Sequence, residues 1–80
     1  MQVKSLQHFR QNVARLMEDR GLSYRELAEM AGMSYVFLHR VLTGKANPSI
    51  DVADKVADAL DAQLSDLIAD PSAKKFPVLS

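Results

Sequence analysis

Four side chains close together in the middle of the chain could contact the edges of nucleic acid bases: Tyr35, Val36, His39 and Arg40. An arginine guanidinium can donate two parallel hydrogen bonds to guanine O6 and N7, or it can pair with a phosphate. Tyr35 and Val36 offer apolar contact to thymine methyl groups, and the tyrosine hydroxyl adds a polar group. His39 is either a base contact or an ordinary surface histidine. These residue types predict a surface that contacts DNA, provided that one element presents them together.

The element that would present them is a short helix that follows another short helix closely. Ser23 and Glu26 have the spacing of a capping box, which predicts that a helix begins there. Gly32 ends that helix after about two turns and permits a tight turn, because a Cβ at this position would clash or require a strained dihedral. Ser34 then caps a further helix, predicted over residues 35–43.

The apolar residues of this pair predict which face is displayed. Leu38 and Val41 anchor the helix at 35–43 to the core, while Ala28 lies where the two helices cross. A larger side chain than alanine would push the helices apart. The opposite face therefore points outward and could enter a major groove. It carries Tyr35, Val36, His39, Arg40 and Thr43.

Three more helices complete the predicted fold, one that ends near Arg20 and two over residues 50–60 and 64–69. The fold class is therefore all-α, a compact arrangement of five short helices. Gly21 supplies a left-handed residue after the first of them. The residues predicted to face inward are Leu6, Phe9, Val13 and Leu16, then Leu27, Ala28 and Ala31, then Ile50, Ala53, Val56, Ala57 and Leu60, and finally Leu64, Leu67 and Ile68.

The formal net charge is zero, but the charges are distributed unevenly along the chain. Residues 1–50 carry seven Lys or Arg against four Asp or Glu, and residues 51–80 carry three against six. A domain with this polarity can turn a basic face toward phosphates and keep an acidic face in water. The alternative is ordinary surface charge with no partner.

Several other classes of protein are disfavoured by the sequence. The absence of cysteine removes disulfides and thiolate ligands or nucleophiles. His8, His39 and the carboxylates are scattered over short helices without a glycine-rich phosphate loop, so we expect no enzyme activity, metal or cofactor. The chain starts with polar residues and has no long apolar run, which predicts no signal peptide, no membrane partner and a cytoplasmic location.

The chain contains several short motifs in a recognisable order. They are GLS at 21–23, ELA at 26–28, AGMS at 31–34, TGKANPS at 43–49, ADAL at 57–60 and LSDLI at 64–68. From about Phe9 to Ile68 the chain resembles the phage-repressor-type helix-turn-helix family, also called lambda-repressor-like or XRE/Cro-type. The resemblance implies a sequence-specific regulator of transcription that binds double-stranded DNA, a repressor acting as a homodimer on a two-fold operator.

The resemblance also implies phosphate contacts around the helix pair. Helix starts favour anions through their amides and dipole, and the loop after the second helix matches a phosphate-contacting loop of the family. The predicted phosphate-binding residues are Ser23, Tyr24, Thr43, Lys45 and Asn47, with Asn12 and Arg25 as further candidates.

At three places the chain departs from the family pattern. Tyr24 replaces a common glutamine, so a phosphate contact there must use the tyrosine hydroxyl or the backbone. Met17 and Leu42 occupy positions where many relatives bury an arginine and a glutamate, and we expect apolar packing between them instead. Asp61 stands where glycine is usual, and Asp tolerates a left-handed backbone moderately.

Residues 1–70 are predicted to form the DNA-binding domain, with the helix-turn-helix at about 23–44, and residues 71–80 a tail that is flexible or forms a dimer. A single recognition helix contacts too few base pairs for useful affinity, which favours a dimer. One rival remains, a protein-interaction module of the same fold, or an antitoxin or controller protein whose main partner is a protein. The predicted dimer contacts are Leu64, Ile68, Phe76, Val78 and Leu79.

Overall fold

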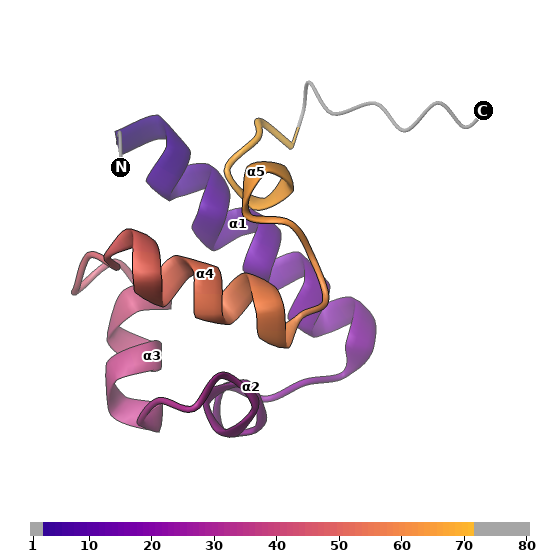
Figure 1. Cartoon of the computed structure of the whole chain (residues 1–80), viewed down its shortest axis with the longest axis vertical. Coiled ribbons are helices and arrows are strands. Elements are labelled where there is room, and N and C mark those ends of the chain that lie inside the picture. The colour runs from indigo at the N-terminus through magenta and orange to yellow at the C-terminus, as the bar shows by residue number, and fades with distance from the viewer. Residues whose placement is uncertain (1–2, 72–80) are drawn as a thin grey trace.

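The computed structural model describes residues 3–71, which contain five helices and no strand, so the predicted all-α class is confirmed (Figure 1). The fifth helix ends at Leu67, two residues before its predicted end, and its first residue follows Gln63 without a side-chain cap. Phe76, Val78 and Leu79 lie outside the described residues. The helices are α1 (Val3–Arg20), α2 (Tyr24–Ala31), α3 (Tyr35–Leu42), α4 (Ile50–Ala59) and α5 (Leu64–Leu67).

The helix pair α2 and α3 begins at the serines that the sequence indicated. The capping box at the start of α2 is complete: the Glu26 amide donates to Ser23 Oγ at 3.1 Å, and the Ser23 amide donates to Glu26 Oε1 at 2.9 Å. At the start of α3 the Phe37 amide donates to Ser34 Oγ at 3.1 Å. Each bond satisfies an amide that has no partner inside its own helix, so both starting points are determined locally.

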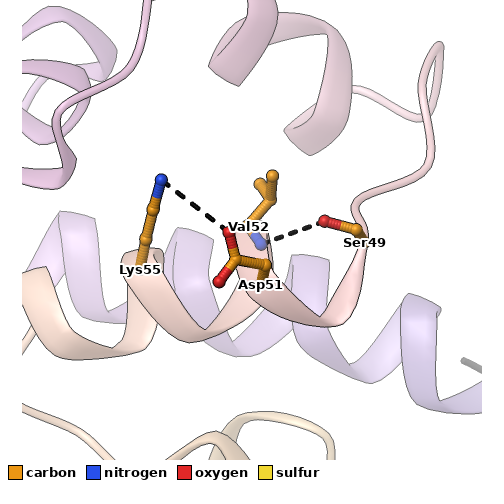
Figure 2. A network of polar contacts seen from close by, with 4 residues as sticks. All are labelled: Ser49, Asp51, Val52 and Lys55. Carbon is orange, nitrogen blue, oxygen red and sulfur yellow. Dashed lines mark hydrogen bonds and ion pairs between the residues drawn. The ribbon is translucent and has the colours of Figure 1, made fainter.

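The start of α4 is also capped by a serine hydroxyl (Figure 2). The Val52 amide donates to Ser49 Oγ at 3.1 Å, and Asp51 lies in the first turn, where a negative charge complements the helix dipole. Lys55 Nζ lies 3.8 Å from Asp51 Oδ2, one turn further along. Both side chains are largely exposed, so this ion pair contributes little to stability.

The turns at Gly32 and Asp61 both use a left-handed backbone. Gly32, between α2 and α3, has φ of 71°, and Asp61, after α4, has φ of 53°. A Cβ built on Gly32 meets no atom within 4 Å, so the turn needs glycine for its dihedral and not to avoid a clash. Asp61 occupies a position with the geometry of a glycine cap, as its place in the family pattern suggests.

The apolar core lies between the helices and is built from their predicted inward faces. The three inward residues of α2 are buried as expected, and Met17 is buried with Leu42 packed against the same core. Ile50 is the exception, because its side chain is 59 % exposed. It is the first residue of α4, and helical side chains tilt toward the N-terminus, so no later turn covers it. The fully buried large side chains are Phe9, Val13, Leu27, Leu38, Val41, Val56, Leu60 and Leu67.

Polar side chains of α1 bind the carbonyl ends of three other helices. Arg10 Nε donates to the Val41 carbonyl at the end of α3, at 2.7 Å. Asn12 Nδ2 donates to the Leu67 carbonyl of α5 at 2.7 Å, and His8 Nδ1 lies 3.3 Å from the Ile68 carbonyl. Arg20 donates to the carbonyl that ends α4. The last carbonyls of a helix lack partners within it, so α1 stabilises these ends from outside.

Candidate nucleic-acid interface

The orientation of α3 is set by two side chains. Leu38 and Val41 are completely buried, as predicted, and they hold one face of the helix against the core. On the other side Val36 is 65 % exposed and Tyr35 is 38 % exposed, and Arg40 is exposed as well. Figure 1 shows α3 at the margin of the molecule, joined to α2 at one end and to the α3–α4 loop at the other. A helix displayed in this way has the shape that fits a DNA major groove.

An aromatic cluster joins the start of α2 to this face. The rings of Tyr24 and His39 meet edge to face with their centroids 5.0 Å apart, and the Tyr35 and His39 centroids are 5.8 Å apart. The Arg25 guanidinium carbon lies 4.7 Å from the centre of the Tyr35 ring. His39 is therefore half-buried between two tyrosines, and it is less outward than the helical pattern predicted. Tyr24 and His39 come from different helices, so no spacing within α3 indicates their contact.

At the end of α3 two candidate contacts bind the protein's own backbone. One Nη of Arg40 donates to the Lys45 carbonyl at 3.4 Å, which is a long hydrogen bond that a better acceptor can replace. Thr43 Oγ1 donates to the His39 carbonyl at 2.7 Å. A phosphate is only an acceptor at this site, so Thr43 must break its own bond before it can donate to one.

The other predicted phosphate contacts lie on both sides of α3. Lys45 and Asn47 are exposed in the α3–α4 loop. At the start of α2 the capping box occupies the amides of Ser23 and Glu26, so the next amides, of Tyr24 and Arg25, are the ones able to bind an anion. The first group lies beside α3, where the Tyr24 ring contacts His39, and the second follows the end of α3 in the chain.

Arg10 is a residue whose use the sequence did not indicate. Besides the Val41 carbonyl, its guanidinium reaches the Ala46 carbonyl at 3.1 Å and Asn47 Oδ1 at 3.5 Å. With the oxygen of Asn47 facing Arg10, the amide nitrogen of that side chain is turned away and can donate outward. Arg10 thus holds the loop that follows α3. Its partners are 31 to 37 residues away, so no local pattern could reveal them.

Only some of the cationic side chains in the first fifty residues are therefore available to bind a ligand. Arg10 and Arg20 donate to helix ends inside the domain, and Asn12 is turned toward α5, where it also reaches the Ala69 carbonyl at 3.0 Å. The exposed cations around α3 are Arg25, Arg40 and Lys45. Two of the predicted dimer residues, Leu64 in α5 and Ile68 directly after it, are half-buried and pack in part against the domain's own core.

No helix within residues 3–71 has the length and apolar character needed to cross a membrane.

The chain is similar to a known regulatory protein and to a family model of a DNA-binding domain. A protein of Methanocaldococcus jannaschii, named as an HTH-type transcriptional regulatory protein, is 45 % identical over 47 residues, which are 59 % of this chain and 15 % of that relative. The chain thus spans a small part of the relative's length. The comparison with solved structures produced no match. The family model described as a Cro/C1-type HTH DNA-binding domain matches residues 12–72, and the chain therefore belongs to the Cro/C1-type helix-turn-helix family.

Proposed function

We propose that this protein is a sequence-specific regulator of transcription that binds double-stranded DNA through α3 and represses by occupying its operator. The observation that carries the proposal is the contrast along α3, where Leu38 is completely buried and Val36 is 65 % exposed. Repression needs only occupancy of a site, which a domain of this size can supply. Such a regulator would act in the cytoplasm. Its role requires no enzymatic activity, cofactor or small ligand.

In this proposal the residues divide into two roles. Tyr35, Val36 and Arg40 contact base edges, with His39 beside them in the aromatic cluster. Contacts to the backbone fix the position of α3 in the groove without specifying sequence. They come from Ser23, Tyr24, Thr43, Lys45 and Asn47, where Ser23 acts mainly by capping α2.

A protein-interaction module of the same fold is the second candidate, as in an antitoxin or a controller protein. The exposed apolar side chains of Val36 and Tyr35 favour it, because such side chains also serve protein interfaces. The salt dependence of binding to duplex DNA distinguishes the two candidate functions. Binding of the full chain to duplex DNA should weaken steeply as salt rises, because each phosphate contact releases a counterion. Fluorescence anisotropy with a random duplex in dilute buffer measures this directly, and absence of binding there would contradict the DNA proposal.

Arg40→Ala is expected to weaken binding to a selected operator by about 1–3 kcal/mol and to relax the preference at one base pair. The reason is the loss of paired hydrogen bonds from the guanidinium to guanine. Competition titrations with single-base variants of the operator measure the change. An equal loss for every duplex, with a smaller salt slope, would make Arg40 a phosphate contact and contradict its role at a base.

We further propose that residues 1–70 form the DNA-binding domain and that residues 71–80 help it to dimerise. A two-fold dimer places its recognition helices about 34 Å apart, on successive turns of the major groove. Leu64 in α5 and Ile68 directly after it still expose part of their surface, close in the chain to the start of this tail. The tail contains the apolar residues Phe76, Val78 and Leu79, and such side chains favour contact with another apolar surface over exposure to water.

Truncation after Asp70 should therefore weaken self-association and operator affinity together, each by roughly tenfold or more, which is about 1.4 kcal/mol. Sedimentation velocity and DNA titration measure the two quantities. A matched variant with Phe76, Val78 and Leu79 replaced by serine keeps the length and the lysines of the tail, and should behave like the truncation. Unchanged dimerisation and affinity in both variants would remove the tail from the interface.

A further inference from the structure

We propose that Val36 recognises the C5-methyl group of a pyrimidine in the major groove. The protein's site then contains, at one position of each half-site, a thymine or a 5-methylcytosine, and the protein distinguishes either from its unmethylated counterpart. This inference rests on the proposed DNA binding and specifies the chemical group that the recognition helix takes.

The position and the chemistry of Val36 lead to this group. Its side chain is 65 % exposed, the largest exposed fraction among the large apolar side chains of residues 4–71, and it lies in the first turn of α3. Valine has no hydrogen-bond donor or acceptor, so it cannot recognise the polar groups of a base. The one apolar group on the edges of base pairs in the major groove is the C5-methyl of thymine. Cytosine acquires the same group at the same carbon when it is methylated.

Ser34 and Tyr35, which precede Val36 in the chain, both make contacts within the protein. The Ser34 hydroxyl accepts from the Phe37 amide as the cap of α3, at 3.1 Å. The Tyr35 ring lies between the Arg25 guanidinium, 4.7 Å away, and the His39 ring, 5.8 Å away. Two neighbours of Val36 therefore already have partners in the protein. Valine is also rigid, because its branched Cβ restricts χ1 in a helix, so its methyl groups are held in place before DNA binds.

The size of the effect follows from the area of one methyl group. Burial of a single methyl group between apolar surfaces changes an equilibrium constant by about 3- to 10-fold. Replacement of the recognised thymine by uracil removes that group and leaves every hydrogen-bonding atom of the base unchanged. Uracil substitution therefore isolates the methyl contact from all polar contacts at the same position.

The experiment uses the full chain and a duplex selected from random DNA. Each thymine is replaced in turn by deoxyuridine, and affinities are measured at one salt concentration. We expect one position in each half-site to lose about 3- to 10-fold, and 5-methylcytosine there to bind more tightly than cytosine by a similar factor. Val36→Ala should abolish both differences at that position alone. Met30→Ala is the matched control, because it removes an apolar side chain 54 % exposed on α2 and should preserve them.

The outcomes separate this inference from the proposed function. If the wild-type chain binds duplex DNA with the expected salt dependence but no uracil substitution weakens it, the methyl contact is wrong and the DNA proposal stands. If a uracil effect exists and persists unchanged in Val36→Ala, another residue makes the contact and the assignment to Val36 fails. If no duplex binds in dilute buffer, the proposed function fails first and the inference fails with it. Circular dichroism confirms that each variant is folded.

Discussion

Replacement of Leu38 by alanine is expected to lower the free energy of unfolding by about 2–5 kcal/mol, whereas Val36→Ala should change it by less than about 0.5 kcal/mol. The two residues are two positions apart on α3, yet Leu38 is completely buried and Val36 is 65 % exposed. Truncation of Leu38 leaves a cavity beneath α3, while truncation of Val36 only removes exposed apolar surface. Small domains are marginally stable, so Leu38→Ala removes a large part of the total free energy of unfolding.

Thermal and urea unfolding followed by circular dichroism measure both variants. For a domain of this size each kcal/mol corresponds to about 4–8 °C in melting temperature, so Leu38→Ala should melt at least about 8 °C below the wild type. Equal effects of the two substitutions would mean that α3 does not present the face described above. In that case the assignment of Val36 and Arg40 to DNA bases would lose its structural basis.

The second large effect is expected at Arg10. Arg10→Ala should destabilise the domain by about 2–3 kcal/mol, because it removes charged hydrogen bonds to part-buried carbonyl groups. The bonds reach the Val41 carbonyl at 2.7 Å and the Ala46 carbonyl at 3.1 Å, at the end of α3 and in the following loop. The loss should therefore be greatest around that loop. Hydrogen exchange at the amides of Lys45 and Ala46 should accelerate, and DNA affinity should fall with it.

Two variants make the test at Arg10 specific. Arg15→Ala removes the same side chain from the same helix at an exposed position and should cost less than about 0.5 kcal/mol. Arg10→Lys keeps the charge but loses the planar arrangement of donors, and should recover less than half of the stability. If Arg10→Ala proves no more harmful than Arg15→Ala in urea unfolding, the bonds to the end of α3 do not matter for stability.

The starts of α2, α3 and α4 could be predicted because their cause is local. Ser23 with Glu26, Ser34 and Ser49 each satisfy an amide three residues ahead, so the pattern and the hydrogen bond involve the same short stretch. The burial of Leu38 could be predicted as well, because helical periodicity indicates which side chains share a face. Ile50 shows the limit of that argument. It shares the inward face by spacing but stands at the first turn of α4, where no neighbouring element covers it.

The site itself could be predicted only in part. The spacing of Val36, Leu38 and Arg40 was enough to expect which side of α3 is displayed, since that depends on the helix alone. The position of His39 between Tyr24 and Tyr35 was not predictable, because the three rings come from two helices whose crossing the sequence does not specify. The same holds for Arg25, whose stacking on Tyr35 depends on how closely α2 and α3 pack.

By itself, the sequence determined the helices, their caps and the displayed face of α3, because each of these depends on residues within one or two turns of each other. Only the tertiary structure decided which charges remain available to a ligand. Arginine side chains are long and flexible, and the carbonyl partners of Arg10 and Arg20 are 31 or more residues away. Arg10 and Arg20 therefore stabilise helix ends, and Arg25, Arg40 and Lys45 remain exposed around α3.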